Sequence, residues 1–443
     1  MTSTPSSPAP ASPLLDMVRA QKRGEPRGIY SICSANRFVL EAGLLEAKAD
    51  GSVVLIESTS NQVNPLGGYT GTTPAQFVTF VRGLADGVGF PMERVILGGD
   101  HLGPFPHAGE PAASALDKSR EMVRQYVGAG YAKIHLDTSM RCADDPPGAL
   151  ADATVVERAA ELCAVAEAAR KDAPPGTPAP LYVVGTEVPT PGGEQETQAS
   201  LAVTRVEDAA RTLRLSREAF AKRGLEDAWE RVIALVVQPG VEFGDEVVFD
   251  YDRARAAELR RFVEGEARIV FEAHSTDYQT ETGLRQLVED HFAILKVGPG
   301  LTFAFREAVF AFTEIEREWL GGRKGVVLSD LRRVAQEVMR KNPGYWQKYY
   351  QGDDDALRHA RQFSLSDRIR YYWPQPEIQA AFTRLLDNLT AHRPPASLLS
   401  QYLPRPHRAL REGRVSADPR DLIRHHIMEV LEIYARACGM RRA

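Results

Sequence analysis

The sequence predicts an α/β protein of the TIM (β/α)₈ barrel class, followed by a helical extension. Eight short apolar runs recur between residues 29 and 300, and segments with helical spacing lie between them. A barrel of this class typically takes ~250 residues, and more with insertions, so this length is sufficient to close one. A doubly wound open sheet is the alternative. It is disfavoured because no GxGxxG follows the first run, where a dinucleotide-binding fold would carry it.

The eight runs have the composition of strands that are buried on both faces. They are mostly aliphatic or β-branched, and each ends in polar residues or glycine. In chain order they are IYSICSAN (29–36), VVLIEST (53–59), VILGGDH (95–101), KIHLD (133–137), LYVVGTE (181–187), IALVVQPG (233–240), RIVFEAHS (268–275) and FAILKVGPG (292–300).

The segments between the runs have the spacing of helices. Strands that alternate with such helices form βαβ units in a parallel sheet. The clearest segments follow the second, third, fourth and sixth runs, and read FVTFVRGLADGV, ALDKSREMVRQYVGAG, TVVERAAELCAVAEAARKD and AAELRRFVEGE.

Three regions are expected along the chain. Residues 1–13 form a disordered lead rich in Ser, Pro and Ala, without the basic and apolar regions of a secretory signal. Residues 14–320 form the barrel. Residues 321–443 form a helical extension packed on the barrel or on a neighbouring subunit, because segments such as LSDLRRVAQEVMRKN begin with helix-start signals. Aromatic-rich pieces, among them SDRIRYYWPQP, lie between these helices.

The composition excludes several function classes. The 443 residues carry 54 Lys and Arg against 59 Asp and Glu, a net charge of -5, so nothing indicates a nucleic-acid-binding surface. No stretch approaches the ~20 apolar residues that a membrane-spanning helix needs. Four cysteines without CxxC spacing exclude a disulfide scaffold and a cysteine-rich zinc module. We therefore expect a cytoplasmic protein.

The carboxyl ends of the predicted strands are unusually polar. In a parallel barrel these ends and the loops after them carry the catalytic residues. Three of the ten histidines lie there on separate strands, which predicts a metal site, although a single histidine in such a place is more often structural. The candidates are Asn36, Glu57, Asp100, His101, His135, Asp137, Glu187, Gln238, Glu272, His274 and Lys296.

The predicted metal ligands are His101 and His274, with Glu187 or Gln238 completing the shell. Imidazole and carboxylate groups suit Zn²⁺, and Mn²⁺, Co²⁺ or Ni²⁺ remain open. His135 shares its orientation with Asp137 in KIHLD. We expect that pair to contact substrate or to support the ligands.

Asp100 and Glu187 are the predicted catalytic carboxylates. An acid beside a metal can exchange a proton with a substrate hydroxyl. Strand alternation would send Asp100 and His101 to opposite sides, unless the strand breaks into a loop at this point. The alternative role for Asp100 is to cap a helix or to orient a loop.

A glycine-rich loop after the eighth strand predicts phosphate binding. Barrels often bind phosphate near strands 7 and 8 at a helix N-terminus. Backbone N–H groups of Gly298 and Gly300, the Thr302 hydroxyl and the Lys296 ammonium are the expected contacts, with Asn36 and Glu57 as further substrate contacts. The alternatives are that glycine only permits a tight turn, and that Lys296 is a Schiff-base amine.

Several motifs resemble the accessory, non-catalytic subunit family of class II D-tagatose-1,6-bisphosphate aldolase. They are SANRFVLEAGL, IESTSNQVNPLGGYTG, GGDHLGP, KIHLDTSM, GTEVPTPGGEQE, FEAHSTDYQ and LKVGPGLTFA. The resemblance covers about residues 14–440. It implies a TIM barrel related to class II aldolases, in a complex that cleaves the ketose bisphosphate into glycerone phosphate and glyceraldehyde 3-phosphate. An older label for such proteins, tagatose-6-phosphate kinase, has no support in a GxxxxGK[ST] motif.

The resemblance to catalytic class II aldolases implies roles for individual residues. Asp100 stands where those enzymes have their proton donor, and His101 and His274 stand where they have zinc ligands. At the sixth strand the aldolases have a histidine, whereas this sequence reads VVQPGVEFG, so Gln238 or Glu242 would have to substitute.

Two functional hypotheses follow from these patterns. The first is an accessory subunit that stabilises a separate catalytic aldolase subunit. The second is a metal-dependent 4-epimerase of a ketose or ketose phosphate, in which retro-aldol cleavage between C3 and C4 is followed by rotation of the aldehyde and re-formation of the bond. A sugar-binding barrel without partner or turnover is a third possibility. An oligomer is expected for each of the first two.

Overall fold

Eight parallel strands close into a barrel in the computed structural model, which describes residues 12–173, 177–186 and 201–441. The strand order around the barrel is β1-β10-β9-β6-β5-β4-β3-β2, and each of the eight predicted runs overlaps one strand. The predicted barrel is confirmed. The strands are β1 (Ile29–Ile32), β2 (Val54–Thr59), β3 (Val95–Leu102), β4 (Lys133–Leu136), β5 (Leu181–Val184), β6 (Val232–Val236), β9 (Val270–Ala273) and β10 (Phe292–Val297), and a separate hairpin pairs β7 (Glu242–Phe243) with β8 (Val248–Phe249).

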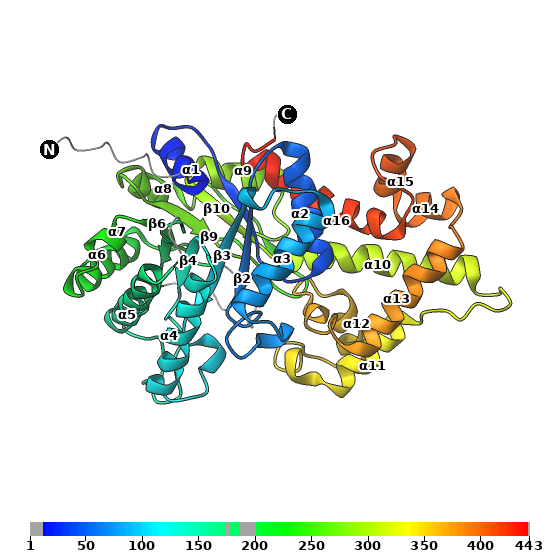
Figure 1. Cartoon of the computed structure of the whole chain (residues 1–443), viewed down its shortest axis with the longest axis horizontal. Helices are drawn as coiled ribbons and strands as arrows, with labels where there is room; N and C mark the ends of the chain where they lie inside the picture. Colours follow the sequence, from blue (N-terminus) through cyan, green and yellow to red (C-terminus); the bar gives the residue numbers. More distant parts are fainter. Residues whose placement is uncertain (1–11, 174–176, 187–200, 442–443) are drawn as a thin grey trace.

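Helices follow the barrel strands along the chain and surround the sheet (Figure 1). Some of them begin at a residue whose side chain caps free backbone N–H groups. The Asn36 side chain, for example, accepts hydrogen bonds from the backbone of Phe38 and Val39 at the start of the helix after β1. The helices of this part are α1 (Pro13–Lys22), α2 (Arg37–Asp50), α3 (Pro74–Val88), α4 (Ala112–Gly128), α5 (Asp152–Lys171), α6 (Val206–Lys222), α7 (Glu226–Trp229), α8 (Ala257–Glu264), α9 (Glu281–Glu289) and α10 (Pro299–Leu320).

The barrel interior is apolar near the amino ends of its strands. Leu55, Val183 and Ile294 pack there with Leu14 and Met17 of α1, which closes this end of the barrel. A larger apolar core fills the space between the strands and the surrounding helices. Polar side chains are therefore concentrated in the opposite, carboxyl-terminal half of the barrel.

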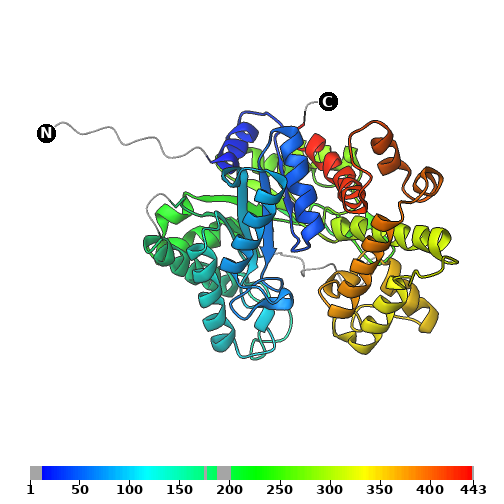
Figure 2. The same ribbon diagram turned by 45° about the vertical axis from the view of Figure 1, so that its right-hand side comes forward.

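The helical extension lies beside the barrel mouth and returns to the barrel at its end (Figure 2). Helix α16 packs against α2 and α9, and the Tyr434 hydroxyl donates to the Thr276 carbonyl at 2.6 Å. An ion pair of 2.6 Å joins Arg424 of α16 to Glu41 of α2. The extension contains α11 (Leu331–Lys341), α12 (Asp354–Phe363), α13 (Pro376–Ala391), α14 (Ala396–Tyr402), α15 (Pro404–Arg411) and α16 (Pro419–Ala437).

The boundaries of the three predicted regions can be compared with the structure only in part. Residues 1–11 of the predicted lead lie outside the described residues, and Pro13 already belongs to α1. Helix α10 ends at Leu320, where the extension was predicted to begin. In the described part of the chain, none of the helices combines the length and apolar character needed to cross a bilayer.

Candidate active site at the barrel mouth

A cavity opens at the carboxyl ends of the barrel strands. Its empty volume, with the open mouth included, is about 610 Å³. Asp100, His101, His274 and Lys296 line it from the barrel, and Arg370 lines it from the extension. The cavity therefore lies where the sequence predicted the site. One of its walls is formed by the helical extension and not by the barrel.

Three imidazoles from different strand ends converge beside this cavity. The ring centroids of His101 and His135 are 5.1 Å apart, those of His101 and His274 are 5.0 Å apart, and those of His135 and His274 are 5.3 Å apart. Imidazoles that share one tetrahedral Zn²⁺ at ~2.0–2.1 Å have centroids separated by roughly 5 Å. The spacing of the three rings is thus compatible with one shared metal ion.

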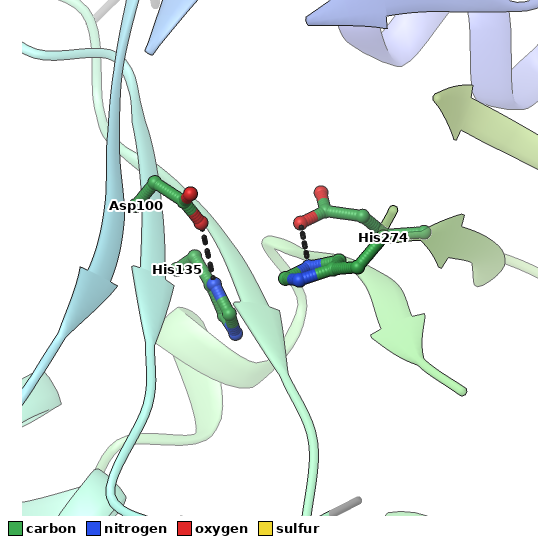
Figure 3. Close-up of side chains that lie close together, drawn as sticks. Asp100, His135 and His274 are labelled. Atoms are coloured by element: carbon green, nitrogen blue, oxygen red, sulfur yellow. Dashed lines mark hydrogen bonds and ion pairs between the residues drawn. The ribbon is translucent and has the colours of Figure 1, made fainter. Parts of the chain in front are cut away.

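Each of the three imidazoles has one nitrogen held by a carboxylate. His101 Nδ1 lies 2.7 Å from Asp137, His135 Nδ1 lies 2.9 Å from Asp100, and Figure 3 shows the contacts of His135 and of His274, whose Nε2 lies 3.0 Å from the Glu272 carboxylate. An ionised carboxylate only accepts, so these three nitrogens carry protons, and the second nitrogen of each ring has a lone pair when that ring is neutral. Burial would lower the pKa of His101, but Asp100 and Asp137 raise it, so this ring would release a proton on binding a metal ion. Carboxylates orient metal-binding histidines in this way.

One nitrogen of His135 remains available to a metal ion. Its Nε2 is buried and has no hydrogen-bond partner among residues 12–173, 177–186 and 201–441. The backbone N–H of His101 also lies 3.3 Å from His135 Nδ1, but the shorter contact with Asp100 assigns the proton to that nitrogen. A buried imidazole lone pair without a donor is costly unless a ligand uses it. The residue set therefore fits a divalent metal ion.

The wider group has the composition of a metal site. Ligand atoms of Asp100, His135, Glu272 and His274 all lie within 4.8 Å of one another, and all four residues are buried. Burial lowers the pKa of His274 to about 3, despite its hydrogen bond with Glu272. His274 is consequently neutral at physiological pH, which is the form that binds metals.

Asp100 faces the cavity in its ionised form. Burial alone would raise the pKa of this carboxyl, but the neighbouring His101 and Lys296 hold it well below its usual range. Its Oδ1 lies 2.5 Å from the Lys296 ammonium, whose own pKa the carboxylates raise well above the ordinary value against the effect of burial. Lys296 is thus a permanent cation, which disfavours a Schiff-base role. The alternative that Asp100 caps a helix is not observed, because its carboxylate binds these side chains instead.

The strand alternation that separates Asp100 from His101 is broken by the backbone. His101 has φ of 49°, a left-handed conformation that is rare for residues other than glycine. Its Nε2 consequently lies 3.7 Å from Asp100 Oδ2, and both side chains line the cavity. Asp137 holds the His101 imidazole on the side away from Asp100. Burial would raise the pKa of Asp137, but its hydrogen bond with His101 lowers this pKa to about 2.

A layer of four alternating charges supports the site from inside the barrel. Lys133 Nζ lies 2.7 Å from both Glu57 and Glu272, and Lys296 Nζ lies 2.8 Å from Glu57. The predicted substrate contact Glu57 is therefore a buried ion-pair partner beneath the cavity. Gly98 of β3 makes room for it, because a Cβ there would lie 2.6 Å from Glu57 Cγ.

Two further predicted metal ligands are not brought to this group. The carbonyl oxygen of the Gln238 side chain accepts from the backbone of Gly240 and Val241, so it closes a turn after β6 instead of facing the imidazoles. Glu242 lies in β7, where its carboxylate accepts from the backbone of Phe243. The remaining predicted residue, Glu187, lies outside the described residues.

The predicted phosphate loop already has a carboxylate bound to it. Asp277 Oδ1 accepts from the backbone of Gly298 at 2.9 Å and of Gly300 at 2.7 Å. The Thr302 hydroxyl donates to Asp367 at 2.8 Å. A phosphate at this loop would have to displace Asp277, so the loop is a poor anion site as it stands. Sequence reasoning missed this because Asp277 lies in another loop, after β9.

Asp277 makes stability depend on pH. Burial raises its pKa to about 6, against the backbone hydrogen bonds that lower it. The folded chain then binds a proton that the unfolded chain, with an ordinary pKa near 4, releases between pH 4 and 6. Stability from this group is present at pH 4 and lost by pH 6, by up to about 3 kcal/mol. Chemical unfolding of wild type and Asp277→Asn from pH 4 to 7 measures the difference, and parallel pH profiles of the two proteins would contradict it.

The family comparison is consistent with this architecture. Residues 14–439 match the family of D-tagatose-1,6-bisphosphate aldolase subunit GatZ/KbaZ-like proteins. A probable tagatose 6 phosphate kinase from Sinorhizobium meliloti shares 46% sequence identity with a TM-score of 0.84, over 93% of this chain and 100% of that one. The YdjI aldolase from Escherichia coli K12 aligns at 11% identity and a TM-score of 0.40, over 86% of this chain and 97% of its own.

A fructose-bisphosphate aldolase from Campylobacter jejuni aligns at 16% identity and a TM-score of 0.44, over 85% of this chain and 91% of that one. The family match runs through both the barrel and the extension, and a relative of the same architecture shares nearly half of the residues. This chain belongs to the D-tagatose-1,6-bisphosphate aldolase subunit GatZ/KbaZ-like family.

Proposed function

We propose that this chain supports the activity and stability of a separate catalytic subunit of D-tagatose-1,6-bisphosphate aldolase. The observation that carries this proposal is the family match over residues 14–439, which extends through the helices beside the barrel. Such a subunit stabilises its partner by mass action when it binds only the folded form.

A reconstitution experiment tests this accessory role. Cleavage of D-tagatose 1,6-bisphosphate by a catalytic subunit is measured with and without an equimolar amount of this chain, together with the thermal midpoint of that subunit. We expect both quantities to rise. The His274→Ala variant is the matched control, because a supporting role should not require the cluster of three imidazoles to be intact. Unchanged activity and midpoint would rule out the accessory role.

A second function is supported by the cluster of three imidazoles. We propose that the chain is also a metal-dependent 4-epimerase of a ketose or ketose phosphate. A supporting scaffold has no need for three carboxylate-oriented imidazoles, one with a buried lone pair, beside an open cavity. Such constellations are typical of catalytic metal sites. His101, His135 and His274 are the residues that would hold the ion, with Zn²⁺ favoured by the donors.

The roles of the protein residues follow from their positions. A bound divalent cation would supply Lewis-acid polarisation of the ketone oxygen. The ionised Asp100 carboxylate at the cavity wall accepts the proton of the C4 hydroxyl while the C3–C4 bond breaks. After the aldehyde has rotated, Asp100 returns the proton as the bond re-forms, and the configuration at C4 is inverted. Before the first step, Lys296 keeps Asp100 ionised, so that its carboxylate is ready to accept this proton.

Incubation of metal-loaded protein with D-fructose 6-phosphate or D-tagatose tests the epimerase. We expect the C4 epimer to accumulate with at least one of Zn²⁺, Mn²⁺, Co²⁺ or Ni²⁺, and Asp100→Asn to abolish its formation while the metal stays bound. Absence of product with all four metals would remove this second function and leave the accessory role intact.

A further inference from the structure

A short segment of the extension is locked onto the barrel beside the cavity. This segment is the 3₁₀ turn η5 (Arg368–Tyr371), and the residue before it, Asp367, is buried. The Asp367 carboxylate binds Arg306 of α10 at 2.8 Å and accepts from the Thr302 hydroxyl at 2.8 Å. Buried charge pairs with several hydrogen bonds fix a geometry more effectively than exposed ones. The extension therefore presents η5 to the cavity in a defined position.

Arg370 of η5 stands at the junction of two connected cavities. It lines the site cavity of about 610 Å³ and also a neighbouring cavity of about 400 Å³ between η5 and the loop after β1. Cys33, Gln62, Tyr69 and Gly298 line both spaces as well, so the two are lobes of one site. A ligand that reaches from the imidazoles into the second lobe must pass the guanidinium.

The Arg370 guanidinium forms no ion pair with a carboxylate in the part of the chain that the structure describes. Its hydrogen bonds go to the Ser366 carbonyl and, at 2.8 Å, to the Tyr371 hydroxyl, and its carbon lies 4.4 Å from the Tyr371 ring centre. Among the ion pairs of residues 12–173, 177–186 and 201–441, none includes Arg370, whereas the nearby Arg306 is paired with Asp367. The Asp277 and Asp367 carboxylates attract this guanidinium without forming an ion pair with it, so its N–H groups remain able to bind an anion directly.

The second lobe provides uncharged polar groups for the rest of such an anion. Ser34, Asn36 and Thr70 line it, and none of the described residues in its lining is an Asp or a Glu. Hydroxyl and amide groups around one guanidinium are a suitable environment for a planar or tetrahedral oxyanion. The glycine loop at α10 does not compete for this role, because Asp277 already accepts from its N–H groups.

We propose that Arg370, supplied by the C-terminal extension, binds the terminal oxyanion of a ketose whose carbonyl end lies at the three imidazoles. This inference rests on the proposed epimerase site. The oxyanion is a phosphate ester or a carboxylate at the far end of the sugar, since a guanidinium fork pairs with either. The extension is then part of the substrate site, and Arg370 distinguishes charged from uncharged ketoses.

Calorimetric binding to the full chain tests the proposal, with and without Zn²⁺. The probes are D-fructose 6-phosphate, D-fructuronate and D-fructose. We expect at least one of the two anionic probes to bind about tenfold or more tightly than D-fructose, and Arg370→Ala to weaken that probe by about tenfold or more. Affinity for D-fructose should not change. The anionic probe that shows this dependence identifies the oxyanion.

Matched variants separate recognition from folding. Arg370→Lys keeps the charge without the fork and should retain part of the preference for the anion. Arg405→Ala removes an exposed arginine of the extension and should leave all affinities unchanged. Equal thermal midpoints would show that the variants are folded, and if Arg370→Ala does not fold, the lysine variant carries the comparison.

Four outcomes distinguish this proposal from the proposed epimerase. It is overturned if Arg370→Ala binds both anions as wild type does, or if wild type prefers neither anion over D-fructose. Arg370-dependent binding without turnover would retain this inference and remove the epimerase. Epimerisation that is indifferent to Arg370 and to the charge of the sugar would retain the epimerase and remove this inference.

Discussion

Replacement of Lys133 by methionine is expected to lower the free energy of unfolding by about 3–5 kcal/mol. The Lys133 side chain is fully buried, and its ammonium lies 2.7 Å from Glu57 and from Glu272. Methionine fills a similar volume but leaves the two carboxylates with Lys296 as their remaining nearby cation. Uncompensated buried charge is among the most destabilising single changes in a protein. Guanidinium unfolding of the metal-free chain, followed by far-UV circular dichroism, measures the loss.

Two further variants identify charge as the cause. Lys341→Met removes an exposed lysine of the extension and should change stability by less than about 0.5 kcal/mol. Adding Glu57→Gln to Lys133→Met should recover part of the loss, because one of the two stranded carboxylates is neutralised. A Lys133→Met protein as stable as the wild type would mean that the charge layer is not a structural support of the site.

Loss of one imidazole is expected to lower the affinity for Zn²⁺ at least 100-fold. His135→Ala and His274→Ala remove rings whose centroids lie 5.3 Å apart, and each ring is oriented by a carboxylate. A metal that loses one of three imidazole donors loses several kcal/mol of binding, of which 100-fold is about 2.7 kcal/mol. Competition titration with a chromogenic chelator at pH 7.5 measures the affinities.

The matched control for these variants is His359→Ala, which removes an exposed histidine of α12 and should leave Zn²⁺ affinity unchanged. His101→Ala adds a test of the ligand set. If the ion binds only the group of Asp100, His135, Glu272 and His274, this variant retains affinity. If the three imidazoles share the ion, it loses affinity as the others do. Wild-type affinity in His274→Ala would contradict both ligand sets.

The barrel and the place of the site could be predicted because they depend on local patterns. Each strand is a short apolar run with polar residues after it, and parallel strands bring those ends together at one mouth. His101, His135 and His274 could therefore be placed in one group, because their convergence depends only on the strand ends and on the parallel direction of the strands.

Roles that depend on contacts across the chain could not be predicted in this way. Glu57 lies at a strand end but pairs with Lys133 inside the barrel, and Gln238 turns back onto its own loop. Asp277 occupies the glycine loop from a different strand end. Each of these contacts depends on which side chains lie close together in the folded chain, and the pattern of residues along the sequence does not contain that information.

Arg370 shows the same limit most clearly. Arg370 belongs to the aromatic-rich segment SDRIRYYWPQP. The composition of this segment does not indicate that Arg370 lines a cavity together with the loop after β10, which lies more than 70 residues earlier in the sequence. Its position depends on Asp367 pairing with Arg306 of α10. The combination of a positive φ at Asp367 and a charge pair between distant elements became visible only in three dimensions.

We propose that one divalent ion binds among the three carboxylate-oriented imidazoles at the barrel mouth. Anomalous X-ray diffraction at the zinc edge, from crystals grown with Zn²⁺, tests it most directly. The predicted result is a single strong peak ~2.0–2.1 Å from a ring nitrogen of each of His101, His135 and His274. No peak at the barrel mouth, or a peak bound only by surface residues, would contradict the claim.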